Sequence, residues 1–238
     1  MGVHGGPDIV TDGLVFAVDA ANEQSWTGPN SNNAYNTVGT TVGSIINDTS
    51  GSYGDNNSFI FDGVDDSIDF TLPSQTLYHL SIWFSRTAGI TTSQVGSNRT
   101  LLGWGESGTL TGIFFGAFTS AATDETILLY QNSQGTNRLT YIRDTANSNF
   151  HNLSINWNGS SYDMYLDGTS RTTYIGNVGH LQQLTINHLY LGRSNNSVYE
   201  HTGNISNCQI YNRSLSASEV LHNYNALKGR FGLWNLDQ

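Results

Sequence analysis

The segment NLSINWNGSSYDMYLDG, residues 152–168, decides the fold. Apolar residues occupy every second position in each of its halves: Leu153, Ile155 and Trp157, then Tyr162, Met164 and Leu166. An alternation of period two is typical of β-strands that bury one face. Asn158-Gly159 lies between the halves and favours a tight turn, so the segment predicts a β-hairpin.

Similar short apolar segments recur along most of the chain. Residues 77–86 carry aromatic side chains on both faces of the predicted strand, which favours a central strand covered on each side. Further segments lie at 13–20, 100–104, 112–118, 126–131, 139–143, 185–192 and 203–211, with Gly, Ser and Asn clusters between them. Regularly spaced short strands of this kind indicate an all-β sandwich or barrel.

Two stretches near the N-terminus carry turn residues. Residues 58–70 hold two apolar runs around Asp62-Gly63, and this pattern predicts a second hairpin. Residues 23–57 form a long polar region, rich in Asn, Ser, Thr and Gly, with short strands predicted at most around 35–38 and 42–46. Long polar connections usually lie at the surface and often carry binding function.

The pattern changes to a helical one near the C-terminus. Ser216 and Glu219 have the spacing of a capping box, and apolar residues follow at helical intervals until Gly229. We therefore predict one short helix over 216–228. The chain is expected to form a single domain over 1–238, with an N-terminal arm over 1–12 and a C-terminal tail over 229–238.

Composition excludes several classes of protein. The chain has 238 residues, of which 19 are acidic and 9 basic, for a formal charge of −10, so a phosphate backbone would be repelled and nucleic acid is not an expected partner. Cys208 is the only cysteine, which excludes an intrachain disulfide. We find neither a signal-peptide pattern nor an apolar run of transmembrane length, and we expect no membrane insertion.

Several segments resemble one known family. They are GLVFAVDAANEQSW (13–26), FIFDGVDDSIDF (59–70), YDMYLDG (162–168), YLGRS (190–194) and GNISNCQIYNRSLSASEVLHNYNALKGRFG (203–232). Together they resemble the laminin-G-like, concanavalin A-like domains of tailed-bacteriophage virion proteins. The resemblance implies a two-sheet antiparallel jelly roll, and it is weakest over 27–57. Relatives include lectins, laminarinase-type hydrolases and structural modules, so the fold alone does not assign a function.

Catalysis on this fold requires paired carboxylates in a cleft. The nearest pairs in sequence are Asp65 with Asp66, Asp124 with Glu125, and Asp163 with Asp167. Asp163 and Asp167 are the best of these, because the alternation places them on one strand face. Asp167 is explained more simply as the start of an Asp-Gly turn, and we predict that the protein is not an enzyme.

Binding sites of two kinds stay open. The resemblance implies a Ca²⁺ site at the sandwich rim, for which Asp19, Asn22, Asp62 and Asp65 are the candidates, and turn formation is the simpler explanation for all four. Aromatic residues in or beside polar loops could stack on a sugar ring: Trp26, Tyr53, Trp104 and Tyr199. Trp104 has the same parity as Leu102, which favours core packing instead.

The resemblance and the missing catalytic pattern together predict a non-enzymatic structural protein on the exterior of a phage virion, as a capsid decoration, head fibre or tail-associated protein. We expect it to be made in the bacterial host cytoplasm, to bind other virion proteins and to form a homo-oligomer. Phe231, Leu233 and Trp234 would be costly to leave in water, so we expect them to pack on the domain or in an assembly contact. The alternatives are a carbohydrate-binding adhesin that recognises host surface glycan, and an atypical glycoside hydrolase.

Overall fold

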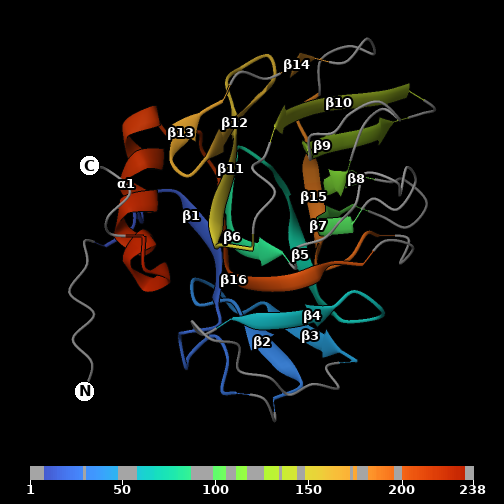
Figure 1. The fold of residues 1–238 in the computed structure, drawn as a ribbon, viewed down its shortest axis with the longest axis vertical. Helices are drawn as coiled ribbons and strands as arrows, with labels where there is room; N and C mark the ends of the chain where they lie inside the picture. Colours follow the sequence, from blue (N-terminus) through green and yellow to red (C-terminus); the bar gives the residue numbers. More distant parts are fainter. Residues whose placement is uncertain are drawn as a thin grey trace.

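The chain folds into two antiparallel β-sheets with a short helix on one outer face (Figure 1). The computed structural model describes residues 8–28, 31–47, 58–86, 99–105, 111–116, 126–133, 136–143, 148–171, 174–175, 182–195 and 200–233. Within these residues the strands form one sheet of seven and one of nine. A large apolar core draws its side chains from both sheets, which confirms the predicted all-β sandwich.

The seven-stranded sheet contains the hairpin that decides the fold. Its main order, with bounds, is β1 (Leu14–Asp19), β16 (Thr202–Tyr211), β6 (His79–Arg86), β11 (His151–Trp157), β12 (Tyr162–Leu166) and β13 (Thr169–Ser170), and β4 (Phe59–Asp62) also pairs with β16. β11 and β12 pair as predicted, with Leu153 opposite Leu166 and Trp157 opposite Tyr162. Every residue of β6 is buried, as expected for a central strand covered on both faces.

The nine-stranded sheet holds most of the remaining strands. Its order is β14 (Tyr174–Ile175), β10 (Thr136–Arg143), β9 (Thr126–Ser133), β8 (Thr111–Gly116), β7 (Arg99–Trp104), β15 (Thr185–Leu191), β5 (Ser67–Thr76), β3 (Val42–Ile46) and β2 (Asn33–Tyr35). The last two strands come from the polar region, where short strands were predicted. They extend one end of this sheet beside β5.

The hairpin predicted over residues 58–70 does not form. β4 pairs with β16 in the seven-stranded sheet, whereas β5 pairs with β3 and β15 in the other sheet. The turn after Asp62 therefore carries the chain from one sheet to the other. Asp-Gly specifies a local reversal, but which strand then pairs with which depends on distant residues.

The predicted helix forms as α1 (Ala217–Lys228), and both hydrogen bonds of the capping box at Ser216 are present. The chain continues into a 3₁₀ turn, η1 (Gly229–Phe231), and the reversal comes at Gly232, whose φ is 71°. No helix in the described residues is long and apolar enough to cross a membrane.

α1 covers the outer face of the seven-stranded sheet, beside β12, β13 and β1 in Figure 1. Tyr165 and Tyr211 from the sheet pack there with Leu215 and Val220 in a second apolar cluster. The ring of Trp83 lies parallel to that of Tyr224, with centroids 5.5 Å apart. This explains how aromatic residues on both faces of β6 are all buried.

Candidate functional site

The two tryptophans proposed for glycan stacking lie inside the protein. Trp26 is 2% exposed and Trp104 is 1% exposed, and both belong to the main core. Trp26 packs on Phe59, with ring centroids 4.9 Å apart. Because a buried ring offers no face to a sugar, the glycan-binding prediction is wrong for Trp26, and the core packing favoured for Trp104 is confirmed. Tyr53 and Tyr199 lie outside the described residues.

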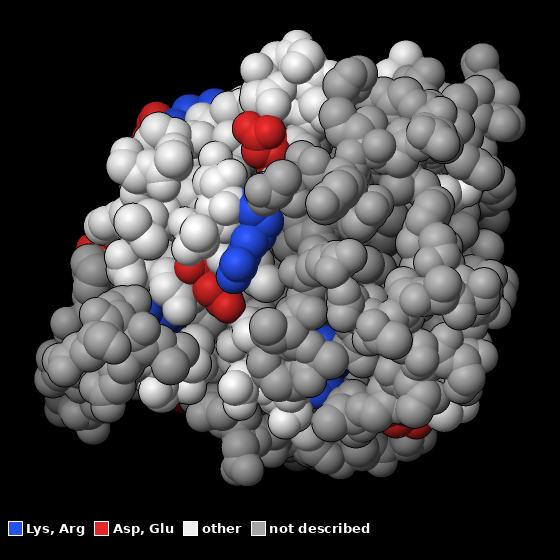
Figure 2. Space-filling model, turned by 45° about the horizontal axis from the view of Figure 1, so that its top comes forward, with Lys and Arg blue, Asp and Glu red and all other residues white. Residues whose placement is uncertain are grey.

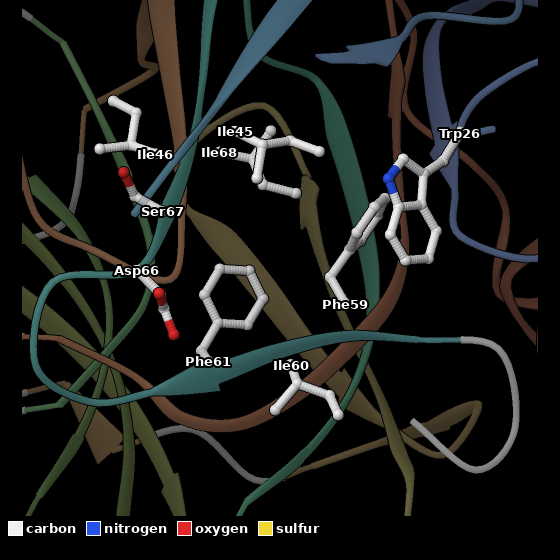
Figure 3. A pocket seen from close by; sticks show the side chains of 9 residues that line it. All are labelled: Trp26, Ile45, Ile46, Phe59, Ile60, Phe61, Asp66, Ser67 and Ile68. Atoms are coloured by element: carbon white, nitrogen blue, oxygen red, sulfur yellow. The ribbon is translucent and has the colours of Figure 1, made fainter. Parts of the chain in front are cut away.

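Trp26 borders a small hollow between the sheets (Figure 3). Its other walls come from β3, β4, the start of β5 and the residue before it: Ile45, Ile46, Phe59, Ile60, Phe61, Asp66, Ser67 and Ile68. The centre of a water molecule could occupy a volume of only about 10 Å³ in this hollow, so there is room for a single water molecule at most. A sugar ring or other organic ligand does not fit in this hollow.

Asp19, one of the calcium candidates, is engaged in an ion pair. Nη1 and Nη2 of Arg230 donate to its two carboxylate oxygens at 2.8 and 3.0 Å. Asn22 uses its side-chain oxygen to accept from the backbone N–H of Gln24 at 2.9 Å, as in an Asx turn. Both side chains thus make local structural contacts, and Ca²⁺ binding by this pair stays a prediction.

Asp62 and Asp65 do come together, and Asp66 joins them. Each of the three offers a carboxylate oxygen, and these oxygens lie within 4.8 Å of one another. Asp62 Oδ1 accepts from Val64 N at 2.7 Å, and Asp66 Oδ2 accepts from Asp62 N at 2.9 Å. These bonds shape the turn. Carboxylates so placed suit a hard cation such as Ca²⁺, and Ca²⁺ binding by Asp62 and Asp65 stays a prediction.

Another carboxylate lies near this turn that the sequence pattern did not indicate. Glu200 forms a β-bridge with Arg193, and its side chain is partly buried. Burial raises the pKa of Glu200 to about 7; Arg193 opposes this shift, while Asp65, Asp69 and Asp66 add to it. Glu200 follows Asp66 by more than a hundred residues, so only the fold brings the two into one electrostatic environment.

Asp69 and Arg193 form an ion pair on the outward side of the nine-stranded sheet. Arg193 Nε donates to Asp69 Oδ1 at 3.0 Å, and Nη2 donates to Asp69 Oδ2. The guanidinium carbon lies 4.5 Å from the centroid of the Tyr190 ring, a cation–π distance. Sequence reasoning missed this group because its members come from β5, β15 and the segment after β15.

The candidate carboxylate pair Asp163 and Asp167 separates in the structure. Asp163 lies within β12 and accepts from the side-chain amide of Asn158 at 2.9 Å. Asp167 follows the end of β12 with φ of 54° and contacts His151 Nδ1 at 2.7 Å through Oδ2. The turn redirects Asp167, so the shared face predicted from the alternation is not maintained. Asp124 and Glu125 lie outside the described residues.

The C-terminal aromatic segment packs on the body of the domain. The Phe231 ring stacks with Trp83 and with Phe150, with both centroid distances 4.5 Å. This confirms that Phe231 packs on the domain, and a role for it in an assembly contact stays a prediction. Leu233 is half-buried, and Trp234 lies outside the described residues.

The comparisons with known proteins agree with this architecture. Residues 62–221 match the family described as the Concanavalin A-like lectin/glucanases superfamily. No curated protein sequence matches the chain.

Three solved structures illustrate the likeness. The first is Trypanosoma rangeli sialidase in complex with sialic acid, at 14% identity and a TM-score of 0.60, where the likeness covers 94% of this chain and 34% of that chain. The second is the receptor binding domain of botulinum neurotoxin C/D mosaic serotype, at 11% identity and a TM-score of 0.59, with 90% of this chain and 51% of that chain covered. The third is the binding domain of botulinum neurotoxin DC in complex with rat synaptotagmin II, at 9% identity and a TM-score of 0.59, with 90% of this chain and 52% of that chain covered. The chain thus spans about a third to a half of their lengths. At such identities the likeness concerns the fold alone. The family match covers well over half of the sequence, so the chain belongs to the concanavalin A-like lectin/glucanase superfamily.

Proposed function

We propose that this protein is a non-enzymatic structural component of the exterior of a tailed-phage particle. It acts there as a capsid decoration, a head fibre or a tail-associated protein, through contacts with other virion proteins and with copies of itself. The proposal starts from the resemblance of residues 13–26 and 203–232 to phage virion domains.

The observation that carries this proposal is the unit formed by β16, α1 and η1. It contains the stretch of sequence with the most specific resemblance, and it is built as one continuous element. β16 pairs with β1, β4 and β6, and α1 then packs back over the outer face of the same sheet. Arg230 ties the end of the unit to Asp19 in β1. A domain whose C-terminal unit packs back on its own sheet in this way is a self-contained module that can be displayed on a larger assembly.

The arrangement of the described carboxylates favours binding over catalysis. Asp163 and Asp167 point to different partners, and the hollow beside Trp26 accommodates no substrate. A glycosidase needs two carboxyl groups that face each other across a substrate.

The charge distribution is also compatible with a protein partner. On the face drawn in Figure 2, charged side chains of the described residues are few and scattered, and they form no broad basic area. The formal charge of the whole chain is −10. Nucleic acid is therefore a poor partner, whereas a surface with few charges suits specific contacts with proteins.

The decisive experiment locates the protein on a particle. Particles purified from the phage that carries this gene are analysed by mass spectrometry, and the protein is located by immunogold labelling with antibodies against the purified chain. We expect a fixed copy number and labelling on the outside of the head, neck or tail. Absence from purified particles, with the protein abundant in the infected cell, would contradict the proposal. Sedimentation equilibrium of the purified chain tests the expected self-association.

A further inference from the structure

Residues 229–233, which follow α1, close over one row of side chains on the outer face of the seven-stranded sheet. The pairing register sets Asp19, Asn207 and Trp83 side by side across β1, β16 and β6. Neighbouring strands lie about 4.8 Å apart, so the row is about 10 Å long. We call residues 229–233 the latch and the three sheet residues the latch row.

Two consecutive residues of the latch contact the two ends of the latch row. Arg230 donates to both carboxylate oxygens of Asp19, and the Phe231 ring stacks on Trp83. The guanidinium carbon of Arg230 lies 5.4 Å from the centroid of the Phe231 ring, so these two side chains form a continuous cover. Asn207 is the middle member of the row and therefore lies beneath this cover.

The Asn207 amide is buried without a partner. Asn207 is 1% exposed, and neither its Oδ1 nor its Nδ2 makes a hydrogen bond to the part of the chain that the structure describes. Gln209, the next outward residue of β16, is 4% exposed, and its Oε1 also has no partner there. A buried amide without a hydrogen bond is unfavourable, and contact with water relieves that cost. The latch row thus destabilises the closed position of the latch.

The backbone bonds of the latch itself are long. Gly232 N donates to Gly229 O at 3.4 Å and Leu233 N donates to Lys228 O at 3.3 Å, beyond the usual range of about 2.7 to 3.2 Å. Among the described residues no side chain caps the start of η1. Glycines stand at both ends of the turn, and Gly232 has a φ of 71°. Because glycine rotates freely, the turn can move at either end.

We propose that residues 229–233 are a conformational latch that opens while the rest of the fold stays intact. In the closed state the ion pair and the ring stack hold the latch on its row. In the open state water reaches Asn207, and the rings of Phe231 and Trp83 become exposed together. Local opening of this kind occurs where a few contacts hold a segment over groups that are better solvated.

The helix before the latch is held independently of it. Val220 packs in the second apolar cluster with residues of the sheet. Asn223 accepts from Val10 N at 2.8 Å and donates to the Tyr211 hydroxyl at 3.0 Å. These contacts do not involve residues 229–233, so α1 can stay docked when the latch opens.

This inference goes beyond the proposed role in the virion and does not rest on it. Opening is a property of the isolated chain, whereas the virion proposal is measured on particles. Its consequence for that role is that the Phe231 ring is available for an assembly contact only when the latch is open.

The competing explanation is a latch that stays closed, with a water molecule bonded to Asn207 beneath it. The amide is then satisfied in the closed state, and its replacement would not stabilise the latch. The two explanations differ in what an apolar side chain at position 207 does to the rate of opening.

Trypsin cleavage of the folded full chain measures this rate, because the enzyme cuts after Arg230 only when the latch is lifted from the sheet. Mass spectrometry of early digests follows the loss of residues 231–238. The reaction is repeated at urea concentrations below the unfolding transition. Cleavage through global unfolding accelerates with urea according to the full equilibrium m-value, whereas cleavage through a small local opening depends on urea only weakly. We expect the weak dependence.

Two variants leave the trypsin site unchanged and alter the latch row. Asn207→Leu keeps the branched shape of the side chain and removes the unsatisfied amide, so it should slow cleavage after Arg230 roughly fivefold. Asp19→Asn removes the charge that Arg230 contacts and should speed this cleavage roughly fivefold to tenfold. Asn32→Leu is the matched control, because Asn32 is exposed and lies beside β2 in the other sheet. Its rate should equal that of the unchanged protein.

Thermal unfolding shows whether each variant is folded, and Asn207→Val takes the place of Asn207→Leu if the larger side chain prevents folding. The proposal is overturned if cleavage after Arg230 follows the full urea dependence of global unfolding. It is also overturned if the folded variant at position 207 is cut as fast as Asn32→Leu and the unchanged protein.

Discussion

Arg230 and Asp19 form a two-point ion pair that joins η1 to the end of β1. The guanidinium nitrogens lie 2.8 and 3.0 Å from the two carboxylate oxygens, and Nη2 also donates to Ser206 Oγ at 3.0 Å. Both charged side chains are about three-quarters buried, at 21% and 26% exposure. The pair connects residues that are more than two hundred positions apart in sequence.

Removing one partner of this pair should destabilise the domain. We expect Arg230→Ala to lower the free energy of unfolding by about 1 to 3 kcal/mol, because Asp19 is then left partly buried without its counter-charge. Urea unfolding followed by Trp fluorescence measures the change. The double variant with Asp19→Asn should recover part of the loss, and strict additivity of the two single changes would argue against direct coupling.

Phe231 anchors η1 by stacking on Trp83 and Phe150. Phe231→Ala should cost roughly 2 kcal/mol, less than a fully buried Phe, since the side chain is only half-buried. Phe231→Leu keeps apolar volume and should cost less. Calorimetric melting of both variants checks the order, and equal melting temperatures for Phe231→Ala and the unchanged protein would show that the stack adds nothing to stability.

His79 should make the protein less stable in mild acid. Burial lowers its pKa from 6.5 to about 4, while the hydrogen bond to Asn156 Oδ1 at 3.1 Å raises it and the charges of Arg213 and Glu219 act in opposite directions. The unfolded chain therefore binds a proton that the folded protein refuses between pH 6.5 and pH 4. Stability is retained above pH 6.5 and falls by up to about 3 kcal/mol as the pH drops to 4.

Comparison with His79→Gln isolates the contribution of this side chain. The variant is expected to be less stable at pH 7, because Asn156, which also binds both backbone groups of Leu215, loses a fitted partner. Its stability should fall less between pH 6.5 and pH 4 than that of the unchanged protein. Identical pH slopes for the two proteins would assign the acid sensitivity to another group.

Glu200, unlike His79, should make the protein more stable in mild acid than at neutral pH. Its pKa is raised from 4.5 to about 7, so the folded protein binds a proton that the unfolded chain has lost in this range. The contribution of Glu200 to stability is then highest below pH 4.5 and declines as the pH rises through 7. Glu200→Gln should abolish this decline. Thermal melting of both proteins from pH 5 to pH 8 tests it, and a variant that loses stability as steeply as the unchanged protein contradicts the assignment.

Part of this structure is readable in short stretches of sequence. Residues 152–168 specify their own hairpin, because alternation and an Asn-Gly turn act within a few residues of each other. Ser216 and Glu219 likewise specify the start of α1 through bonds that span one helical turn. The covered position of β6 also follows from its own aromatic residues on both faces.

Other features depend on pairings that local patterns do not encode. Asp62-Gly63 gives a turn wherever it occurs, but its flanking strands join different sheets because β16 and β15 offer them partners. Trp26 lies in a polar stretch that resembles a surface loop, yet core packing against Phe59 buries it. Glu200 shares an electrostatic environment with Asp65 and Asp66 only because the fold brings these residues together.

The sequence by itself determined the strands, the single helix expected over 216–228 and the sandwich class, because alternation, turn residues and caps act over distances of a few residues. The tertiary structure decided which side chains share a surface. The ion pair of Asp69 and Arg193, which lies against the Tyr190 ring, joins residues from β5, β15 and the segment after β15, and it exists because backbone hydrogen bonding fixes the register of these strands. Strand pairing is a long-range property, and so groups of this kind become visible only in the folded protein.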